Sequence, residues 1–564
     1  MSKNKITNFD AIVIGSGISG GWAAKELTGK GLKTLVIERG RDVQHIKDYP
    51  TTNLSPWEFE HRNELTEEIK QANPIISKCY AFREDAMHFF VKDAEHPYLQ
   101  EKPFDWIRGY QLGGKSLTWA RQTQRWSNYD FEGPKRDGFA VDWPIRYNDL
   151  DKWYSYVEKF IGVSGNKDHI PQLPDGDFLP PMELTKVEKL LQQKIASNYQ
   201  DRQMIIGRCA HISQPKDIHL EQGRSSCQYR NLCQRGCPFG GYFSSNASTL
   251  PWAAKTGKLT IVTDSVAHSI IYNEKQQKAT GVKVIDAKTK AETIYHAPII
   301  FVNAGALNTN LLLLNSKSKR FPNGLGNDNG LLGKYLAFHN YRGSVTAEYH
   351  AELEYTIEGR RPTSGYMPRF RNVFRQDTDF LRGYAVGLGA SPSDQASKNW
   401  GAELKNDLLN PKPGPWKVKS HIMGETIPKE TNKVWLDDRE KDQWGIPKLR
   451  IDISYDENDE KMLADYFEQV TEMFTKAGFT NIKTKDSKQA PGLDIHEMGG
   501  VRMGKDPKTS LLNEWNQLHL CKNVFVTDGA CMTSTSTQNP SLTYMALTAR
   551  ACHYAANQLK NNKL

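Results

Sequence analysis

Two segments near the end of the chain carry side chains suited to acid–base chemistry. His496 opens the glycine-rich run HEMGGVRMG, and Asn539 stands directly before Pro540. An imidazole titrates near neutrality, and the small neighbours leave the ring open to a ligand, so His496 could take a proton from an alcohol. Because proline keeps the residue before it extended, the Asn539 amide can point into a site. The alternative is that His496 only satisfies a loop and Asn539 caps the following helix.

A second group, close to the start of the chain, is typical of a nucleotide-binding turn. Gly15, Gly17 and Gly20 form G-x-G-x-x-G: the first permits a tight turn, the second lets the backbone approach a pyrophosphate, and the third allows close helix–strand contact. Glu38 follows 23 residues after Gly15, where an acid binds a ribose 2′-hydroxyl and disfavours NADP. The motif leaves FAD and NAD both open, and a turn without a ligand is the alternative.

Three cysteines within eleven residues form a candidate metal site. Cys227, Cys233 and Cys237 have the spacing C-x5-C-x3-C, whereas zinc prefers four ligands and pairs spaced by two residues. Three thiolates suit a three-iron, four-sulfur cluster, or a four-iron cluster with one open corner. Incidental buried thiols, or one disulfide and a spare thiol, are the alternatives.

Apolar periodicity indicates the elements that must position these residues. The apolar runs 11–14 and 34–37 flank a helix-like stretch, 20–27, which predicts a βαβ unit at the glycine turn. Further elements are predicted as short strands within 259–302, helices over 149–161, 184–199 and 457–477, a strand over 523–527 and a closing helix over 540–559. Strand–turn–helix signals at both ends predict that the termini share one domain, with a second domain inserted between them.

Composition excludes several classes of protein. The chain has 564 residues, of which 38% are hydrophobic and 25% charged, enough for a sizeable core. Its 74 basic and 65 acidic residues give a net charge of +9 without a basic block, so neither nucleic acid nor a membrane surface is indicated as a partner. Eight cysteines are too few for a disulfide scaffold. The start, MSKNKITNFD, shows no apolar signal segment, so we expect a cytoplasmic protein by default, or a periplasmic one exported with a partner.

Several motifs together resemble the glucose–methanol–choline (GMC) oxidoreductases over most of the chain. They are the N-terminal fingerprint with Glu38, GGKSLTW (113–119), DWPI (142–145), NAGA (303–306), GLGN (324–327), HEMGGVRMG (496–504), VFVTDGA (524–530) and NPSLTYMALTAR (539–550). The resemblance implies an α/β fold with a Rossmann-like FAD-binding domain, interleaved with a substrate domain built on a mainly antiparallel sheet with helices. The predicted FAD domain comprises 1–150, 225–338 and 490–564, and the substrate domain 151–224 and 339–489.

The resemblance also assigns roles to particular residues. His496 matches the base of the HxxG motif, and Asn539 matches its partner. Where pyranose oxidases carry a flavin-linking histidine, this chain has Thr118, so the flavin should be non-covalent. Thirteen residues are predicted to bind the cofactor: Gly15, Gly17, Ser19, Gly20, Glu38, Arg39, Gly113, Gly114, Ser116, Val266, Asp528, Gly529 and Asn539.

The detailed wording of the motifs is similar to a bacterial branch that includes glucoside 3-dehydrogenases and the large subunits of gluconate-type dehydrogenases. This similarity implies oxidation of a secondary hydroxyl, at C3 of a glucoside or disaccharide, to a keto-sugar, with the proton going to His496 and the hydride to flavin N5. The cysteine spacing resembles that of members with a three-iron cluster, which implies a cytochrome acceptor and a small export or chaperone subunit. A sugar or alcohol oxidase that uses oxygen, and a non-catalytic flavin electron-relay subunit, are the alternatives.

Other side chains could face a sugar. Sugars stack their C–H faces on aromatic rings, although core or rim packing is the commoner role of tryptophan. The candidates are Trp119, Trp126, Trp435, His339, His421 and Glu425.

Overall fold

The predicted Rossmann-like unit is present in the computed structural model, which describes residues 7–350, 362–393, 395, 397–410 and 412–564. Its six-stranded sheet has the order β20 (Gln517–Leu518), β21 (Cys521–Val526), β9 (Ile299–Val302), β1 (Ala11–Ile14), β2 (Thr34–Ile37) and β5 (Leu259–Val262). All neighbouring pairs are parallel except β20 and β21. Every residue of β1, β2 and β9 is buried, as expected for parallel strands covered on both faces.

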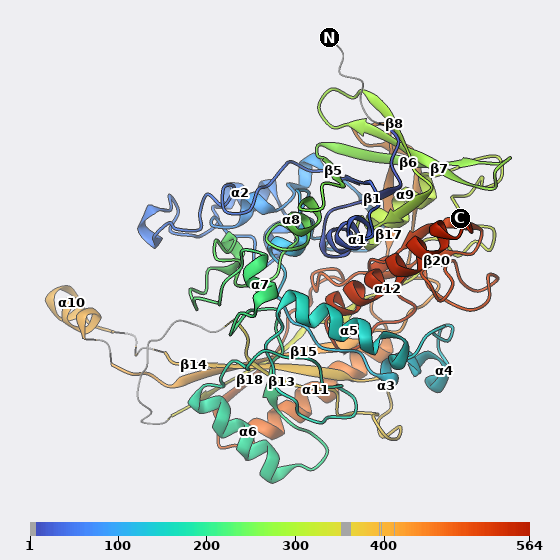
Figure 1. Cartoon of the computed structure of the whole chain (residues 1–564). Helices are drawn as coiled ribbons and strands as arrows, with labels where there is room; N and C mark the ends of the chain where they lie inside the picture. Colours follow the sequence, from blue (N-terminus) through green and yellow to red (C-terminus); the bar gives the residue numbers. More distant parts are fainter. Residues whose placement is uncertain (1–6, 351–361, 394, 396, 411) are drawn as a thin grey trace.

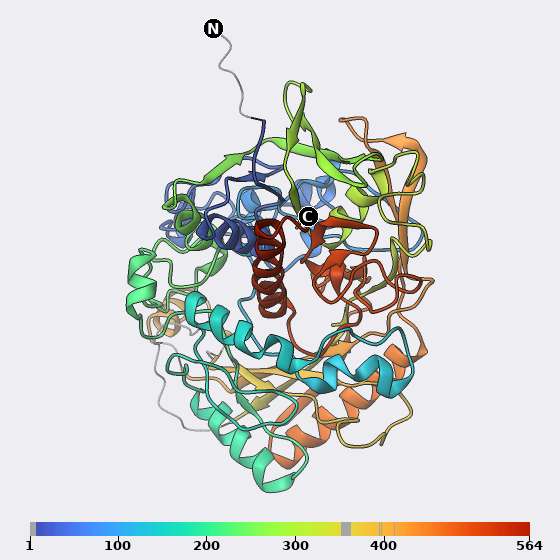
Figure 2. The ribbon, with the colours of Figure 1, turned by 45° about the vertical axis from the view of Figure 1, so that its right-hand side comes forward.

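The two ends of the chain meet on this sheet. Helix α1 (Ile18–Gly29) follows β1, and the closing helix α12 (Ser541–Lys560) packs against α1 (Figures 1 and 2). Small side chains at the contact, Ala23 and Ala24 on α1 with Ala551 and Ala555 on α12, belong to one buried apolar cluster. The chain therefore brings the N-terminal glycine turn and the start of α12, which follows Asn539, to the same region.

A second sheet occupies the lower half of Figure 1 and is antiparallel throughout its pairs. Its order is β18 (Thr480–Asp486), β12 (Gly343–Tyr349), β15 (Trp416–Glu425), β14 (Tyr384–Ser391), β13 (Gly365–Met367) and β4 (Ile205–Ile206), with β11 (His339–Asn340) paired to β15. Apolar side chains of α6 (Lys186–Asn198) and α11 (Glu457–Lys476) cover one face. The fold class predicted from the sequence is confirmed.

Two smaller sheets complete the strands. One has the order β19 (Met498–Gly500), β10 (Lys334–Ala337), β16 (Lys433–Lys441), β17 (Pro447–Asp452) and β3 (Leu99–Gln100); the other is β6 (Ser265–Asn273), β7 (Lys278–Asp286) and β8 (Glu292–His296). The five-stranded sheet joins strands from both predicted domains, whose boundaries stay a prediction. The remaining α-helices are α2 (Glu67–Ala72), α3 (Asn128–Phe131), α4 (Gly133–Asp137), α5 (Tyr147–Ile161), α7 (Asp217–Glu221), α8 (Thr249–Ala254), α9 (Ala306–Asn315) and α10 (Gly401–Leu409).

Helix ends differ from the sequence prediction where a side chain acts as a cap. Helix α5 begins at Tyr147 rather than Asp149, because the Asp149 carboxylate accepts the backbone N–H of Arg146 at 2.7 Å and so belongs to the first turn.

Among the described residues, no helix is long and apolar enough to span a bilayer. Residues 1–6, part of the segment in which we expected no export signal, lie outside the described residues.

The contact between α1 and the turn before it leads to a test. A Cβ on Gly20 would lie 1.9 Å from the backbone oxygen of Gly15, whereas a Cβ on Gly29, in the same helix, meets no atom within 4 Å. We expect Gly20→Ala to lower the free energy of unfolding by about 1–3 kcal/mol through overpacking, and to lower the FAD content. Thermal unfolding and bound flavin are measured beside the control Gly29→Ala. Equal stability of the two variants would contradict the close contact.

Candidate active site

One large cavity, of about 460 Å³, is lined by the glycine turn of the six-stranded sheet and by the face of the antiparallel sheet that α6 and α11 do not cover. From the antiparallel sheet come Tyr366 on β13, Gly387 on β14, and His421 and Met423 on β15. Most predicted cofactor residues line this cavity: Gly15, Gly17, Ser19, Glu38, Arg39, Gly114, Ser116, Val266, Asp528, Gly529 and Asn539. Gly20 and Gly113 do not line the cavity; at both positions the neighbouring residues leave no room for a Cβ atom.

The glycine turn fits a dinucleotide. Gly15 has φ +94°, and a Cβ there would lie 2.3 Å from the carbonyl oxygen of Asn303. A Cβ on Gly17 meets nothing within 4 Å, so the backbone before α1 is open to the cavity at this point. The start of a helix offers unpaired N–H groups and a positive dipole end, which suit phosphate. The adjacent Gly113 is needed for its own turn, with φ +87° and no room for a Cβ beside Asn246.

Glu38 lies at the end of β2, where a ribose would be bound. Its carboxylate accepts backbone N–H groups of Ser16 at 3.1 Å and Gly40 at 2.9 Å. Burial raises the pKa of Glu38, while these hydrogen bonds oppose that rise. Beside it, the Arg39 guanidinium lies over the rings of Tyr110 and Trp444, 4.6 and 4.8 Å from their centroids.

The predicted base, His496, and its predicted partner, Asn539, lie together at the cavity. Asn539 Nδ2 is 3.4 Å from His496 Nε2, and both residues line the cavity. On its other side, His496 Nδ1 is 2.9 Å from Nδ1 of His339, whose ring stands nearly perpendicular to that of His496. His339 is fully buried, does not line the cavity, and places its Nε2 2.7 Å from the carbonyl oxygen of Ser536.

Burial keeps both imidazoles neutral near pH 7. It lowers the pKa of His339 to about 4, and it lowers the pKa of His496 well below its ordinary value, with further contributions from His339 and the Lys115 ammonium. A neutral imidazole can accept a proton, as a general base must. The arrangement therefore allows His496 to act on a hydroxyl held in the cavity.

Charged residues around the pair had no sequence signal of their own. Lys115 forms an ion pair with Glu497 at 3.4 Å. Lys115 stands in the GGKSLTW motif and Glu497 directly follows His496, but neither motif indicated this contact. Asp494 accepts the backbone N–H of His339 at 2.9 Å, and burial raises its pKa to about 7. Their roles depend on contacts between segments almost 400 residues apart in the case of Lys115 and Glu497.

The other candidates for sugar contacts are separated by the structure. Trp119 and His421 line the cavity, whereas Trp126 is fully buried and away from it. Trp435, on β16, also does not line the cavity. Glu425 is wholly buried in an ion-pair network with Arg369 and Arg382, so it holds the fold rather than facing a ligand.

The three clustered cysteines line a second, small cavity. Cys227, Cys233 and Cys237 are free thiols of intermediate exposure, and all three line it together with His211 and Tyr242. Within the described residues, only His339, Asp494 and His496 form a metal-type group with ligand atoms all within 4.8 Å. The ligands of one zinc ion lie about 3.8 Å apart, given bonds of about 2.3 Å, so the thiols are not gathered around a single ion.

Two family models described as GMC oxidoreductase match the chain, one over residues 10–340 and one over 428–548. 2-Methyl-1,2-propanediol dehydrogenase of Mycolicibacterium austroafricanum is 28% identical over 98% of this chain and 96% of that protein. The fructose dehydrogenase large subunit of Gluconobacter japonicus is 24% identical over 99% of both chains. The solved structure of pyridoxine 4-oxidase from Mesorbium loti shares the fold, with a TM-score of 0.60 at 15% identity, covering 97% of this chain and 98% of that one.

The raised pKa of Asp494 predicts a pH dependence. The pKa of an aspartate is about 3.9 in an unfolded chain, whereas that of Asp494 in the folded protein is about 7. Between these pH values the folded state binds more protons than the unfolded state, so the free energy of unfolding falls as the pH rises. Asp494→Asn has nearly the shape of the protonated acid and does not titrate. Its melting temperature, measured on FAD-free protein, should gain on the wild type as the pH rises from 4 to about 7 and then level off.

The exposed Asp438→Asn serves as the control and should show no such trend. A difference between wild type and Asp494→Asn that stays constant across this pH range would contradict the raised pKa.

Proposed function

This chain belongs to the GMC oxidoreductases, an FAD-binding family that acts on CH–OH groups, and from that membership we propose an FAD-dependent dehydrogenase that oxidises the C3 hydroxyl of a glucoside or disaccharide to a keto-sugar. The observation that carries the proposal is the pairing of His496 and Asn539 at the wall of the cavity that also contains the glycine turn. The fructose dehydrogenase relative supports a sugar as substrate.

The cavity has the residues that non-covalent FAD needs. Gly15, Gly17 and the start of α1 would hold the phosphates, and Glu38 a ribose hydroxyl, while Thr118 lines the cavity without a group that could bond the flavin covalently. Bound FAD supplies the acceptor for the hydride removed from the alcohol carbon.

The chain's own chemistry takes place at the substrate hydroxyl. His496 takes the hydroxyl proton as a neutral base, and the Asn539 amide donates a hydrogen bond to the oxygen, on which negative charge develops.

Unpaired polar groups in the cavity wall support an oxygen-rich substrate. Arg121 is buried and lines the cavity, yet its Nε and Nη1 have no hydrogen-bond partner among the residues that the structure describes. A buried unpaired donor costs about 1–3 kcal/mol, which a ligand rich in hydroxyls can recover. Such a wall discriminates against alcohols that lack those hydroxyls.

The test is anaerobic reduction of the bound flavin by a panel of glucosides and simple alcohols. We expect reduction by glucosides with a 3-keto product, and a loss of about 100- to 10,000-fold in the rate for His496→Ala, with FAD retained. His553→Ala, on α12 and away from the cavity, is the control.

Unchanged flavin reduction in His496→Ala would remove this residue from the reaction. Oxygen consumption equal to turnover would identify an oxidase instead, and failure of every sugar and alcohol in the panel would favour a flavin relay subunit.

The cysteine cavity supports the finer part of the proposal, an iron–sulfur cluster held by Cys227, Cys233 and Cys237. Three free thiols on one cavity, spread more widely than the ligands of a single ion, suit bridged irons. The guanidinium of Arg224 is buried near Cys237, so it can offset the negative charge of thiolates at this site. A thiolate-bound cluster supplies electron transfer away from the flavin, and with it we propose a cytochrome acceptor and a small export or chaperone subunit as partners.

Anaerobically purified protein should contain about three iron ions and acid-labile sulfide per chain, with an electron paramagnetic resonance signal of the cluster. Cys233→Ala should lose iron and signal, whereas Cys209→Ala, which changes a buried thiol near Cys227, should keep both. Wild-type protein without iron after reconstitution would contradict the cluster.

A further inference from the structure

His339 contacts His496 from the side away from the cavity, and its hydrogen bonds determine where protons can lie. A carbonyl oxygen only accepts hydrogen bonds, so the Ser536 carbonyl, 2.7 Å from His339 Nε2, requires a hydrogen on that nitrogen. A neutral imidazole carries one N–H. Nδ1 of His339 is therefore bare and can only accept.

The hydrogen positions on His496 follow from those on His339. The two Nδ1 atoms lie 2.9 Å apart, and a hydrogen bond between them needs one hydrogen. Since His339 cannot supply it, His496 donates from Nδ1 and its Nε2 is bare. That nitrogen lies at the cavity, 3.4 Å from the Asn539 amide nitrogen, which is a donor and fits a bare acceptor.

We propose that His339 is a positioning residue that, through the Ser536 carbonyl, selects the tautomer of His496 in which Nε2 is free to take the substrate proton. The proposal rests on the proposed function for the reaction it serves, but the tautomer itself is a property of the protein without substrate. In the other tautomer, Nε2 would carry a hydrogen and could not act as a base, and two bare Nδ1 lone pairs would face each other.

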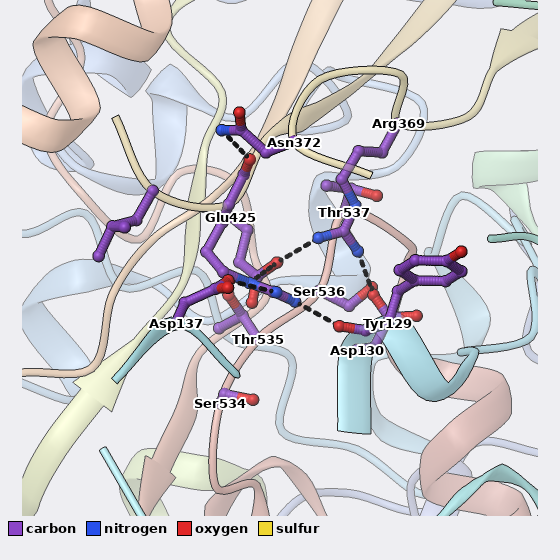
Figure 3. A network of polar contacts seen from close by, with 12 residues as sticks. Tyr129, Asp130, Asp137, Arg369, Asn372, Glu425, Ser534, Thr535, Ser536 and Thr537 are labelled. Carbon is purple, nitrogen blue, oxygen red and sulfur yellow. Dashed lines mark hydrogen bonds and ion pairs between the residues drawn. The ribbon is translucent and has the colours of Figure 1, made fainter. Parts of the chain in front are cut away.

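A buried polar network holds the carbonyl that starts this chain of hydrogen bonds (Figure 3). The Ser536 hydroxyl donates to Asp130 at 3.0 Å, and Asp130 is paired with Arg369. Arg369 also contacts Glu425 at 3.2 Å, and Glu425 is the register partner of His339 between β15 and β11. The network therefore connects the strand carrying His339 with the loop carrying Ser536.

Other charged groups near the pair act on its protonation without setting the tautomer. From the loop that carries His496 come Asp494, which accepts the backbone N–H of His339, and Glu497; from the segment after Gly113 comes Lys115. The Lys115 ammonium disfavours a second proton on His496. Within the part of the chain that the structure describes, none of these three forms a hydrogen bond with the His496 ring, so the ring's bonds are those to His339 and Asn539.

Two substitutions of equal shape test the proposal in the FAD-loaded protein. The Asn oxygen of His339→Asn can still accept from His496 Nδ1, whereas His339→Leu removes the acceptor. We expect His339→Leu to lower the rate of flavin reduction by about 100-fold at a pH where the wild-type rate is constant, and His339→Asn by less than about 10-fold. Substrate affinity should change by less than about 3-fold in both, since the loss is in the reaction step.

Nitrogen NMR of ¹⁵N-histidine-labelled protein reads the tautomer directly, with the His496 signals assigned by their loss in His496→Ala. We expect a protonated Nδ1 and a bare Nε2 in the wild type and in His339→Asn, and a mixture in His339→Leu. The control is His219→Leu: His219 is also fully buried, contacts the Lys159 carbonyl through Nε2 and accepts the Lys216 N–H at Nδ1, but does not line the cavity.

A wild-type His496 with the hydrogen on Nε2 would overturn the proposal, as would equal rates of flavin reduction in His339→Leu and the wild type. Equal losses in His339→Asn and His339→Leu would assign His339 a packing role and also overturn it. If no substrate reduces the wild-type flavin, the proposed function fails, and the NMR measurement still decides the tautomer.

Discussion

Two neutral imidazoles in direct contact, His339 buried and His496 half-buried at the cavity wall, are the constraint on which the site depends. Removal from water makes the charged form of each ring costly, so each must find its hydrogen bonds within the protein. His339 and His496 form one hydrogen bond with each other, and His339 forms a second with the Ser536 carbonyl. The remaining nitrogen, Nε2 of His496, lies at the cavity. A base that is neutral and correctly oriented before substrate arrives needs no reorganisation in the reaction.

These hydrogen bonds require accurate positioning of the surrounding residues, and burying the charged groups that provide it costs free energy. Arg369, Arg382, Asp130 and Glu425 are all removed from solvent, and buried ion pairs seldom add net stability. Removing one partner would leave an uncompensated buried charge, so any rearrangement that separates these pairs is strongly disfavoured. The loop that carries Ser536 is attached to that network through Asp130, and helix α12 begins soon after it, at Ser541.

The cofactor side of the cavity is built on a different principle. There the backbone itself approaches, and side chains are excluded by the positive φ of Gly15 and the tight contact at Gly20. On the substrate side, two nitrogens of the Arg121 guanidinium have no hydrogen-bond partner within the described parts of the chain, as expected of a wall completed by a ligand. Rigid backbone on one side and unpaired donors on the other suit a large cofactor and a small polar substrate.

The sequence by itself determined the βαβ unit, the strands and helices with strong periodicity, and the family, and it singled out His496 and Asn539 as candidates for one site, because these depend on local patterns or on motifs. The tertiary structure alone decided that His339 is buried behind His496, that Glu425 serves a buried network, and that Trp126 belongs to the core. A histidine in a strand has the same local signal whether it faces a ligand or another imidazole; only the register of β11 on β15, and the approach of the Ser536 loop, distinguish the two.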